Sequence, residues 1–495
     1  MSVDADSRHD PLLVKLFSEA LGRQSQGGLS SALAIYKRIQ RQFPYFADAW
    51  INASSALREM GRHEEALDAA LRAIELAPEN PIANFALADA HQCLENINKA
   101  AACFRKTLEY DPGHLPALAN LARIYVNNGY FAQAVELCDR AIKLEPSKSV
   151  IWMLRGQARY FLLDISGAEA DMAQAIALDA NNWLAYAFLA CFQRIQWRYQ
   201  ESWATIKACR DLGGTWVTRQ DFGKPHWNGE PLNGRTLLVY KEQHGFGDYM
   251  QLARFFPYMR RQYGCRILLL IHEPLARLFA DLSGIDGLII RGEPTPDFDV
   301  VSHVGEFFLI INIDPSKLPP PITILPGPRP MPELERPGFK IGLVWDGSPL
   351  YAGNAFRSIS PQLFNDLADM PGIAWYGLQK PPGADLPNLP GFIDMSPHIG
   401  DFMDTAQIAK QLDLIVTVDT SMAHLAGSLG LPTIVMLPHP PDWRWGLNSQ
   451  HSPWYPYPDY LLIRQPVSGE WKGAVDLLRD RIAELMDGIA VALRL

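Results

Sequence analysis

Four side chains that could do chemistry lie within six residues of one another in the second half of the chain. Asp419, Thr420, Ser421 and His424 follow the apolar run 414–418, which is typical of a buried parallel strand, and they open a run that is typical of a helix. The amides at the start of a helix lie at the positive end of its dipole, so they form a site for a phosphate or diphosphate. Asp419 and Thr420 could instead only cap the helix, and His424 could be a packed histidine.

A second motif, Gly245-Phe246-Gly247-Asp248, follows the apolar run 236–240 and precedes another helical run. Gly245 and Gly247 would let the backbone approach a ligand closely. The carboxylate of Asp248 could take a proton from a reacting hydroxyl group, or it could only cap the helix. The third glycine of the dinucleotide fingerprint is missing, which disfavours a Rossmann dehydrogenase.

Two further kinds of loop follow strand-like runs. The loop 345–358 carries Arg357, a cation suited to a phosphate. The loops 442–445 and 454–456 are rich in aromatic residues, which could stack on a base or sugar, or could brace the surrounding lobes.

These loops need sheets to position them. Short apolar runs alternate with helical segments after Asp221, which is the pattern of doubly wound parallel sheets. We expect one Rossmann-like lobe at 222–314 and a second at 338–495, which ends in a helix. The segment 315–337 holds nine prolines in 23 residues and is expected to be a stiff linker. Open parallel sheets bind ligands at the carboxyl ends of their strands, so a cleft between the lobes is the expected site.

The first half of the chain repeats every 34 residues. Pro44, Pro78, Pro112 and Pro146 are in register, and so are Ala32, Ala66, Ala100, Ala134 and Ala168. Proline ends a helix, and small residues allow two helices to approach closely. The pattern predicts an α-helical tetratricopeptide solenoid over 13–216, with about six helix pairs beginning near Leu13, Ala47, Pro81, Leu115, Ser149 and Trp183.

The last repeats depart from the consensus. Ala180 replaces the proline and Trp197 replaces the turn glycine, and such degenerate end repeats are typical of a cap on another domain. Trp183, Trp197 and Trp203 are the expected covering surface.

A solenoid of this kind usually binds an extended peptide or protein on its concave wall. The candidates for a groove that holds an acceptor are polar residues of the inner helices: Asn52, Arg58, Asp89, Asn120 and Arg123. These residues could also form a solvated face of an array that docks on its own neighbour or forms a homo-oligomer.

Composition excludes several classes of protein. The chain is 48% hydrophobic and 20% charged, so it is neither disordered nor of low complexity. A net charge of -9 disfavours a nucleic-acid partner. The six cysteines form no C-x-x-C pair, which is typical of a reduced compartment and gives no sign of a metal site. No secretory signal and no apolar run long enough for an integral membrane segment occur, so we expect a cytoplasmic protein.

From about Thr236 to Pro466 the chain resembles glycosyltransferase family 9, the heptosyltransferase-like group. Together with the repeats, it resembles bacterial proteins that join tetratricopeptide repeats to such a domain. The matching segments occur in the family's order and are 245–251, 342–348, 357–359, 378–380, 401–406, 418–427, 441–445 and 452–456.

The resemblance implies an α/β GT-B fold that transfers a sugar, with inversion, from a nucleotide-diphosphate sugar and without a metal or other cofactor. It implies that Asp248 is the general base, near the lobe that binds the acceptor. It implies a donor-binding set in the second lobe: Arg357, Gln379, Asp419, Thr420, Ser421 and His424. Gln379 would lie near the nucleoside. The chain departs from the family at Gln243, where many relatives carry an acid, and at Ala355-Phe356, where relatives often carry polar or basic residues.

Three functions remain open from the sequence. The favoured one is a glycosyltransferase whose acceptor is a protein bound by the repeat array. The alternatives are a catalytically weak scaffold or interaction protein, and a glycosyltransferase of lipopolysaccharide or exopolysaccharide in which the repeats only oligomerise.

Overall fold

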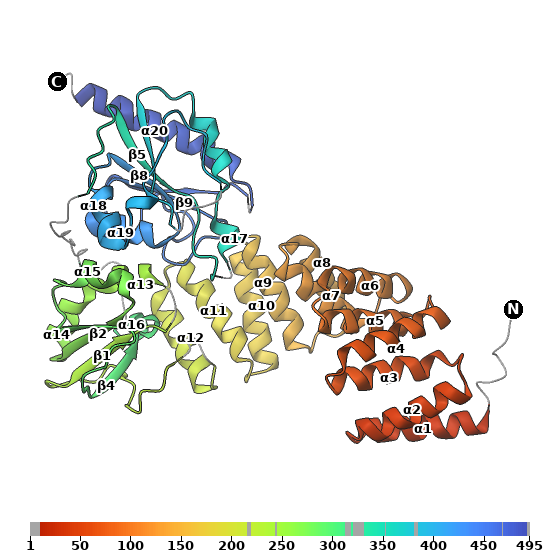
Figure 1. The fold of residues 1–495 in the computed structure, drawn as a ribbon. Coiled ribbons are helices and arrows are strands. Elements are labelled where there is room, and N and C mark those ends of the chain that lie inside the picture. The colour runs from red at the N-terminus through yellow and green to blue at the C-terminus, as the bar shows by residue number, and fades with distance from the viewer. Residues whose placement is uncertain are drawn as a thin grey trace. The chain divides into compact units, whose positions relative to one another are not determined.

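The computed structural model describes residues 10–214, 219–242, 245–311, 318–319, 331–351, 353–380, 385–467 and 469–492. Gln243, Trp216 and most of the proline-rich segment 315–337 lie outside these described residues. The chain divides into two compact units, Met1–Asn182 and Trp183–Leu495 (Figure 1). Among the described residues, no helix combines the length and the apolar character that a bilayer span requires.

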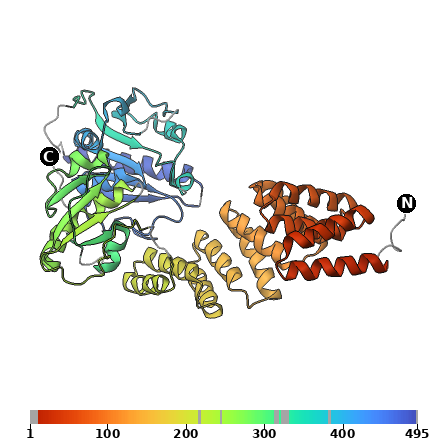
Figure 2. The same ribbon diagram turned by 60° about the horizontal axis from the view of Figure 1, so that its bottom comes forward.

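Antiparallel helix pairs, stacked one after another, make up the described part of the first unit (Figure 2). They are α1 (Pro11–Ser25) with α2 (Leu29–Gln42), α3 (Ala47–Glu59) with α4 (His63–Leu76), α5 (Pro81–Cys93) with α6 (Ile97–Tyr110), α7 (Leu115–Asn127) with α8 (Phe131–Leu144), and α9 (Ser149–Phe161) with α10 (Ile165–Leu178). The first pair begins two residues before the predicted Leu13, because Asp10 caps α1 and Pro11 occupies its first position. The alanines in 34-residue register are completely buried, as close helix packing requires.

The turn inside each pair holds one residue in the left-handed backbone region. Glycine takes this place at Gly27, Gly61 and Gly129, with φ between 75° and 83°. Glu95 and Leu163 take the same place in the third and fifth pairs with φ of 58°, so packing of the two helices enforces the turn even without glycine.

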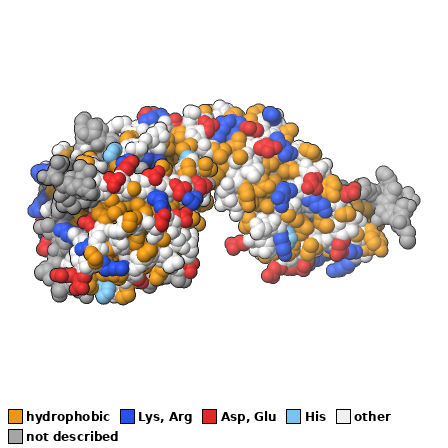
Figure 3. Space-filling view, turned by 90° about the horizontal axis from the view of Figure 1, so that it is seen from above, with side chains coloured by type: hydrophobic (Ala, Val, Ile, Leu, Met, Phe, Trp, Pro, Cys, Tyr) orange, Lys and Arg blue, Asp and Glu red, His pale blue; other side chains and the backbone are white. Residues whose placement is uncertain are grey.

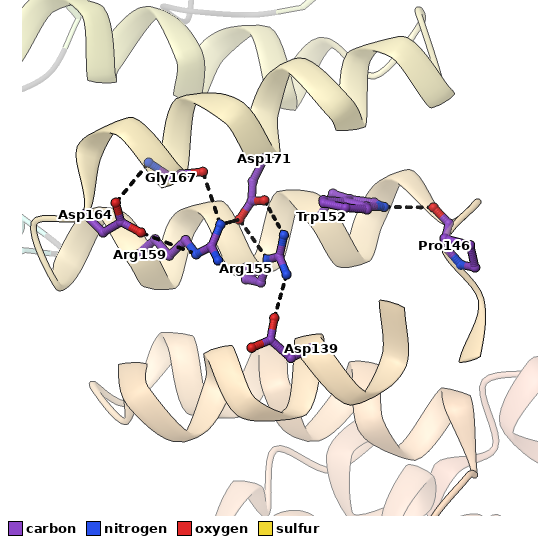
Figure 4. Close-up of polar contacts among 8 residues, drawn as sticks. All are labelled: Asp139, Pro146, Trp152, Arg155, Arg159, Asp164, Gly167 and Asp171. Carbon is purple, nitrogen blue, oxygen red and sulfur yellow. Dashed lines mark hydrogen bonds and ion pairs between the residues drawn. The ribbon is translucent and has the colours of Figure 1, made fainter. Parts of the chain in front are cut away.

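An ion cluster around the buried carboxylate of Asp171 joins the fifth pair to α8 (Figure 4). Arg155 on α9 donates from Nη2 and Nε to the two oxygens of Asp171 on α10, at 2.6 and 2.9 Å, and from Nη1 to Asp139 on α8 at 2.5 Å. Arg159 also bonds to Asp171, whose side chain is only 1% exposed. The residues 34 positions before Arg155 and Asp171 are Leu121 and Leu137, both buried, so the cluster replaces an apolar pair of the preceding repeat.

The second unit begins with a sixth helix pair, α11 (Trp183–Ile195) and α12 (Tyr199–Asp211). Tyr199 and Trp203 are buried in one core with residues of both sheets, and Trp197 packs against Gly446, where an added Cβ would lie 2.7 Å from the indole ring. Whereas the periodicity assigns this pair to the repeat array, its packing assigns it to the sheet-bearing unit. This packing gives the reason for the departure from the repeat consensus.

Two parallel sheets follow, as the sequence predicts. The first has the order β3-β2-β1-β4 and the second has the order β10-β9-β8-β5-β6-β7. The strands are β1 (Thr236–Tyr240), β2 (Arg266–Ile271), β3 (Gly287–Ile290), β4 (Val300–His303), β5 (Phe339–Val344), β6 (Ile373–Gly377), β7 (Ile393–Asp394), β8 (Leu414–Val418), β9 (Thr433–Leu437) and β10 (Tyr460–Arg464). The strand order reverses between β1 and β4 and again between β5 and β8, and such switch points are where open sheets bind ligands.

Helices cover these sheets. They are α13 (Phe246–Leu252), α14 (Phe256–Tyr263), α15 (Ala276–Phe279), α16 (Val304–Ile310), α17 (Asn354–Arg357), α18 (Phe402–Ala409), α19 (Ser421–Leu429) and α20 (Lys472–Ala492). A short 3-10 turn at Ala253–Phe255 separates α13 from α14, and the segment Pro361–Leu367 is a 3-10 helix. On the face shown in Figure 3, basic and acidic side chains are interspersed with apolar ones.

Candidate functional site

A cleft of about 650 Å³ in the second unit is lined by the loops that follow β1, β5, β6, β8 and β9. The site residues that the sequence analysis places in the two lobes all line it: Gly245, Gly247, Asp248, Arg357, Gln379, Asp419, Thr420, Ser421 and His424. Strand-end motifs that are far apart in the sequence therefore meet in one place.

Asp248 lies in the first turn of α13 and is paired with two cations. Its Oδ1 accepts a bond of 2.5 Å from Arg444 Nη2, and its Oδ2 is paired with Lys241 Nζ. Burial acts to raise the pKa of the carboxyl group, but Arg444 and Lys241 outweigh it and hold the pKa at about 2. Asp248 is therefore ionised at neutral pH, and in this state it is a weak base.

The two glycines before Asp248 are required by close contacts. Gly245 has a φ of 139°, and a Cβ there would lie 2.5 Å from Lys241 Cε and 2.8 Å from Asp248 Oδ2. A Cβ on Gly247 would lie 2.5 Å from the ring of His424 and 3.3 Å from Ser421 Cα. The motif thus makes room for the ion pair on one side and for the start of α19 on the other.

Arg444 is a central residue of the site to which the sequence analysis gives no role. Besides Asp248, its guanidinium donates from Nε to Gln251 Oε1 at 2.6 Å and from Nη1 to Asp442 Oδ1 at 2.9 Å, and it lies 4.7 Å from the centre of the Trp443 ring. The available signal was its place in the loop 442–445, which the sequence analysis singles out for its aromatic residues and for its match to the family, without a role for the arginine. Lys241 was missed as well, although it directly follows β1.

Asp419 follows β8 and has an unfavourable environment for its charge. Burial and the carboxylate of Asp442 raise its pKa to about 6, while Trp445, Arg357 and Arg444 act in the opposite direction. A carboxyl group in a cleft whose pKa is shifted this far is typical of a functional site.

Thr420 is the N-cap of α19, since its Oγ1 accepts from the amide of Met422 at 3.3 Å. Thr420 therefore caps the helix, and it also lines the cleft. Ser421 is the first residue of α19 and lines the cleft. The cap fixes the positive end of this helix at the cleft wall.

His424, one turn into α19, is a packed and buried residue that also lines the cleft. It is 5% exposed, it stacks on Trp445 with ring centres 5.4 Å apart, and its Nδ1 pairs with Tyr455 Oη at 3.0 Å. Burial, reinforced by Arg444, lowers its pKa to about 3, so the imidazole is neutral. With Nδ1 engaged by Tyr455, Nε2 is the nitrogen that remains for a ligand.

Arg357 and Gln379 hold the loops at the switch point of the second sheet. Arg357 Nη1 donates to the carbonyl of Asp419 at 2.7 Å, which joins the loop after β5 to the loop after β8. Gln379 is buried, and its Oε1 accepts from the amides of Trp345 and Asp346 at 3.2 and 3.0 Å. Its side chain braces the loop after β5 in this structure.

The five groove candidates lie on the first helices of the second to fourth pairs. Arg58 on α3 lies 3.7 Å from Asp89 on α5, and Arg123 on α7 bonds to Asn120 at 3.1 Å. Burial raises the pKa of Asp89, and Arg58 and Arg123 both oppose this rise, so these three charges interact. Asn52 instead donates to the carbonyl of Asp48 in its own helix.

Comparison with known families shows the repeats. Residues 17–81 and 94–158 match tetratricopeptide repeat models, which confirms the predicted type of repeat. Protein FlbA of Caulobacter vibrioides is 24% identical over 414 residues, covering 75% of this chain and 67% of FlbA. Residues 1–235, which precede the first strand, make up less than half of the chain. A match that covers 75% of the chain therefore extends into the sheets.

Three further similar proteins each cover about a third of this chain. Anaphase-promoting complex subunit 3 of Schizosaccharomyces pombe is 27% identical over 142 residues, which cover 29% of this chain and 21% of that protein. Among solved structures, MamA from Desulfovibrio magneticus RS-1 (17% identity, TM-score 0.33) covers 34% of this chain and is itself 94% covered. YrrB, described as a TPR protein with an unusual peptide-binding site, has 19% identity and a TM-score of 0.31, with 34% of this chain and 88% of YrrB covered.

Proposed function

We propose that the second unit is a GT-B glycosyltransferase that moves a sugar, with inversion, from a nucleotide-diphosphate sugar to a hydroxyl group without a metal. One observation carries this proposal: a carboxylate, Asp248, shares one cleft with two arginines, Arg357 and Arg444, and with the first turn of α19. Helix amides and arginines suit a diphosphate, and a carboxylate suits the proton of an attacking hydroxyl.

The roles of these groups follow from the chemistry of the transfer. The acceptor oxygen forms a bond to the anomeric carbon while the bond from that carbon to the diphosphate oxygen breaks on the opposite face. Asp248 takes the acceptor's proton, and the negative charge that develops on the departing diphosphate is stabilised by α19, Arg357 and Arg444. His424 Nε2 can donate a further hydrogen bond to the same group.

The acceptor that we propose is a protein or peptide bound by the repeat array. The family matches support an array of the kind that binds extended segments, and the interacting charges of Arg58, Asp89 and Arg123 supply polar contacts on its first helices.

A second candidate is an interaction protein whose cleft binds a nucleotide but catalyses no reaction. The observation that favours it is the pairing of Asp248 with two cations, which makes this carboxylate a poor proton acceptor.

The experiment that separates these functions has two stages. A panel of nucleotide-sugars is first screened by thermal shift, since a ligand that binds only the folded state raises its melting temperature. Release of the nucleoside diphosphate is then measured for the parent and for Asp248→Asn. Release by the parent that falls about 10²–10⁴-fold in the variant supports the enzyme. Binding with no release by either supports the interaction protein, and no binding by any member of the panel refutes both.

The acceptor is tested with a triple variant of the array, Asn52→Ala, Asn120→Ala and Arg123→Ala. We expect transfer to the protein acceptor to be lost while slow hydrolysis of the donor continues. The control triple variant changes exposed residues of the second helices instead, Lys37→Ala, Arg105→Ala and Glu136→Ala, and should retain both activities. Retained transfer in the first variant would exclude the array as the acceptor site.

A further inference from the structure

Both carboxylate oxygens of Asp248 are paired with cations. Asp248 Oδ1 bonds to Arg444 and Oδ2 pairs with Lys241, and the three side chains are between 16% and 21% exposed. Ion pairs with this little exposure are stronger than pairs on the open surface. A hydroxyl group that entered this cleft would find the carboxylate already occupied by cations.

The same two cations are the natural partners of a diphosphate. Arg444 and Lys241 line the cleft together with Arg357 and the first turn of α19. The start of α13 touches the start of α19, since a Cβ on Gly247 would lie 3.3 Å from Ser421 Cα. An anion at the first turn of α19 would therefore be a neighbour of the Asp248 pair, and it would offer more charge and more acceptor oxygens than one carboxylate.

Arg444 can exchange partners without moving. Its Nε stays on Gln251, its Nη1 stays on Asp442 and its guanidinium stays over the Trp443 ring, so only the bond from Nη2 has to change. Lys241 carries its charge on a flexible stem and can turn toward the anion.

We propose that a bound diphosphate competes with Asp248 for Arg444 and Lys241, so that arrival of the donor releases the carboxylate that serves as the base. This inference rests on the proposed function. It makes Arg444 a ligand of the diphosphate as well as the group that masks the base. It also implies an order of binding in which the donor precedes a productive acceptor, because only the donor complex holds a free carboxylate.

The test measures the affinity of the full-length protein for inorganic pyrophosphate, and for ADP, GDP and UDP, by titration calorimetry. Asp248→Asn removes the carboxylate charge that competes with the anion for Arg444 and Lys241. We therefore expect this variant to bind pyrophosphate about tenfold more tightly than the parent. Arg444→Gln should bind it about tenfold more weakly, and adding Asp248→Asn to Arg444→Gln should give a smaller gain than it gives in the parent.

Asp401→Asn is the matched control. Asp401 also lines the cleft and is paired with an arginine, Arg277, at 2.9 Å, and it caps α18, which asparagine can do as well. We expect its affinity for pyrophosphate to stay within twofold of the parent. A gain equal to that of Asp248→Asn would show a general effect of charge and would overturn the inference.

The remaining outcomes separate this inference from the proposed function. An unchanged or weaker affinity in Asp248→Asn, with pyrophosphate bound by the parent, overturns the competition and leaves the transferase proposal standing. Absence of binding by the parent for all four probes overturns both. If Asp248→Asn fails to fold, Lys241→Gln replaces it: a tenfold loss of pyrophosphate affinity supports the inference, and an unchanged affinity overturns it.

Discussion

Replacing Asp419 with asparagine is expected to stabilise the protein at pH 8 and to leave its stability unchanged at pH 4. Burial and the neighbouring Asp442 disfavour the charged form of Asp419 in the folded state. Asparagine has nearly the same shape and cannot ionise, so it removes this unfavourable charge. The bond from Arg357 goes to the backbone carbonyl of residue 419, so the substitution keeps it.

The size of the effect follows from the pKa. The pKa rises from 3.8 to about 6 on folding, and each pKa unit corresponds to about 1.4 kcal/mol, so the ionised side chain destabilises the fold by about 3 kcal/mol. The folded protein holds this proton more tightly than the unfolded chain does. Stability therefore falls as the pH rises from about 4 to 6, and the full loss is present above pH 6.

The assay is urea unfolding of the full-length parent and variant at pH 4, 6 and 8, followed by tryptophan fluorescence, because Trp445 lies beside Asp419 in the second unit. An exposed aspartate changed in the same way, Asp459→Asn, controls for the change in net charge. A gain of the same size at pH 4 and pH 8, or a loss at pH 8, would refute the electrostatic reasoning.

Four further predictions follow from the same structure. Asp248→Asn is expected to reduce turnover about 10²–10⁴-fold, measured as release of the nucleoside diphosphate, and a rate within a factor of two of the parent would remove it from the mechanism. Activity should survive a chelator such as EDTA, and activity lost with EDTA and restored by Mg²⁺ or Mn²⁺ would contradict transfer without a metal. Residues 183–495 should be soluble and melt cooperatively, whereas residues 222–495, which lack the buried aromatic face of α12, should aggregate on light scattering. In the repeat array, Arg155→Leu alone should lower the free energy of unfolding by about 3 kcal/mol, measured by chemical denaturation. Adding Asp171→Leu should recover most of this loss, because the double variant has the same apolar pair as the preceding repeat. Additive losses would show that the ion cluster itself stabilises the array.

The sequence predicts the periodic and the fully buried parts of this fold well. The helix pairs recur every 34 residues, and five of the six predicted starts, from Ala47 to Trp183, coincide with the first residues of helices. The strands 236–240 and 414–418 were predicted with their observed bounds, because a strand covered on both faces is a continuous apolar run. The edge strands β7 and β10 were missed, since they are short or only partly buried and lack that signal.

The members of the candidate site were easier to predict than their partners. Strand-end position alone selects Asp248 and Asp419 as cleft residues, because all carboxyl ends of a parallel sheet lie at one edge. The pairing of Asp248 with Arg444 joins residues 196 positions apart and depends on how two lobes meet, which one sequence does not encode locally. The same holds for Gln379, whose partners are backbone amides of a neighbouring loop.

The sixth helix pair connects the end of the repeat pattern with the chemistry of the cleft. Arg194 on α11 lies 5.3 Å from the ring centre of Trp443, and Tyr199 on α12 packs edge-on against the same ring at 5.8 Å. Trp443 in turn lies under the guanidinium of Arg444, which holds Asp248. Side chains of the sixth helix pair therefore contact the loop that carries the main cation of the cleft. Because Arg444 keeps its orientation through these contacts while one of its bonds is exchanged, the packing of α11 and α12 is part of what allows the carboxylate to be released.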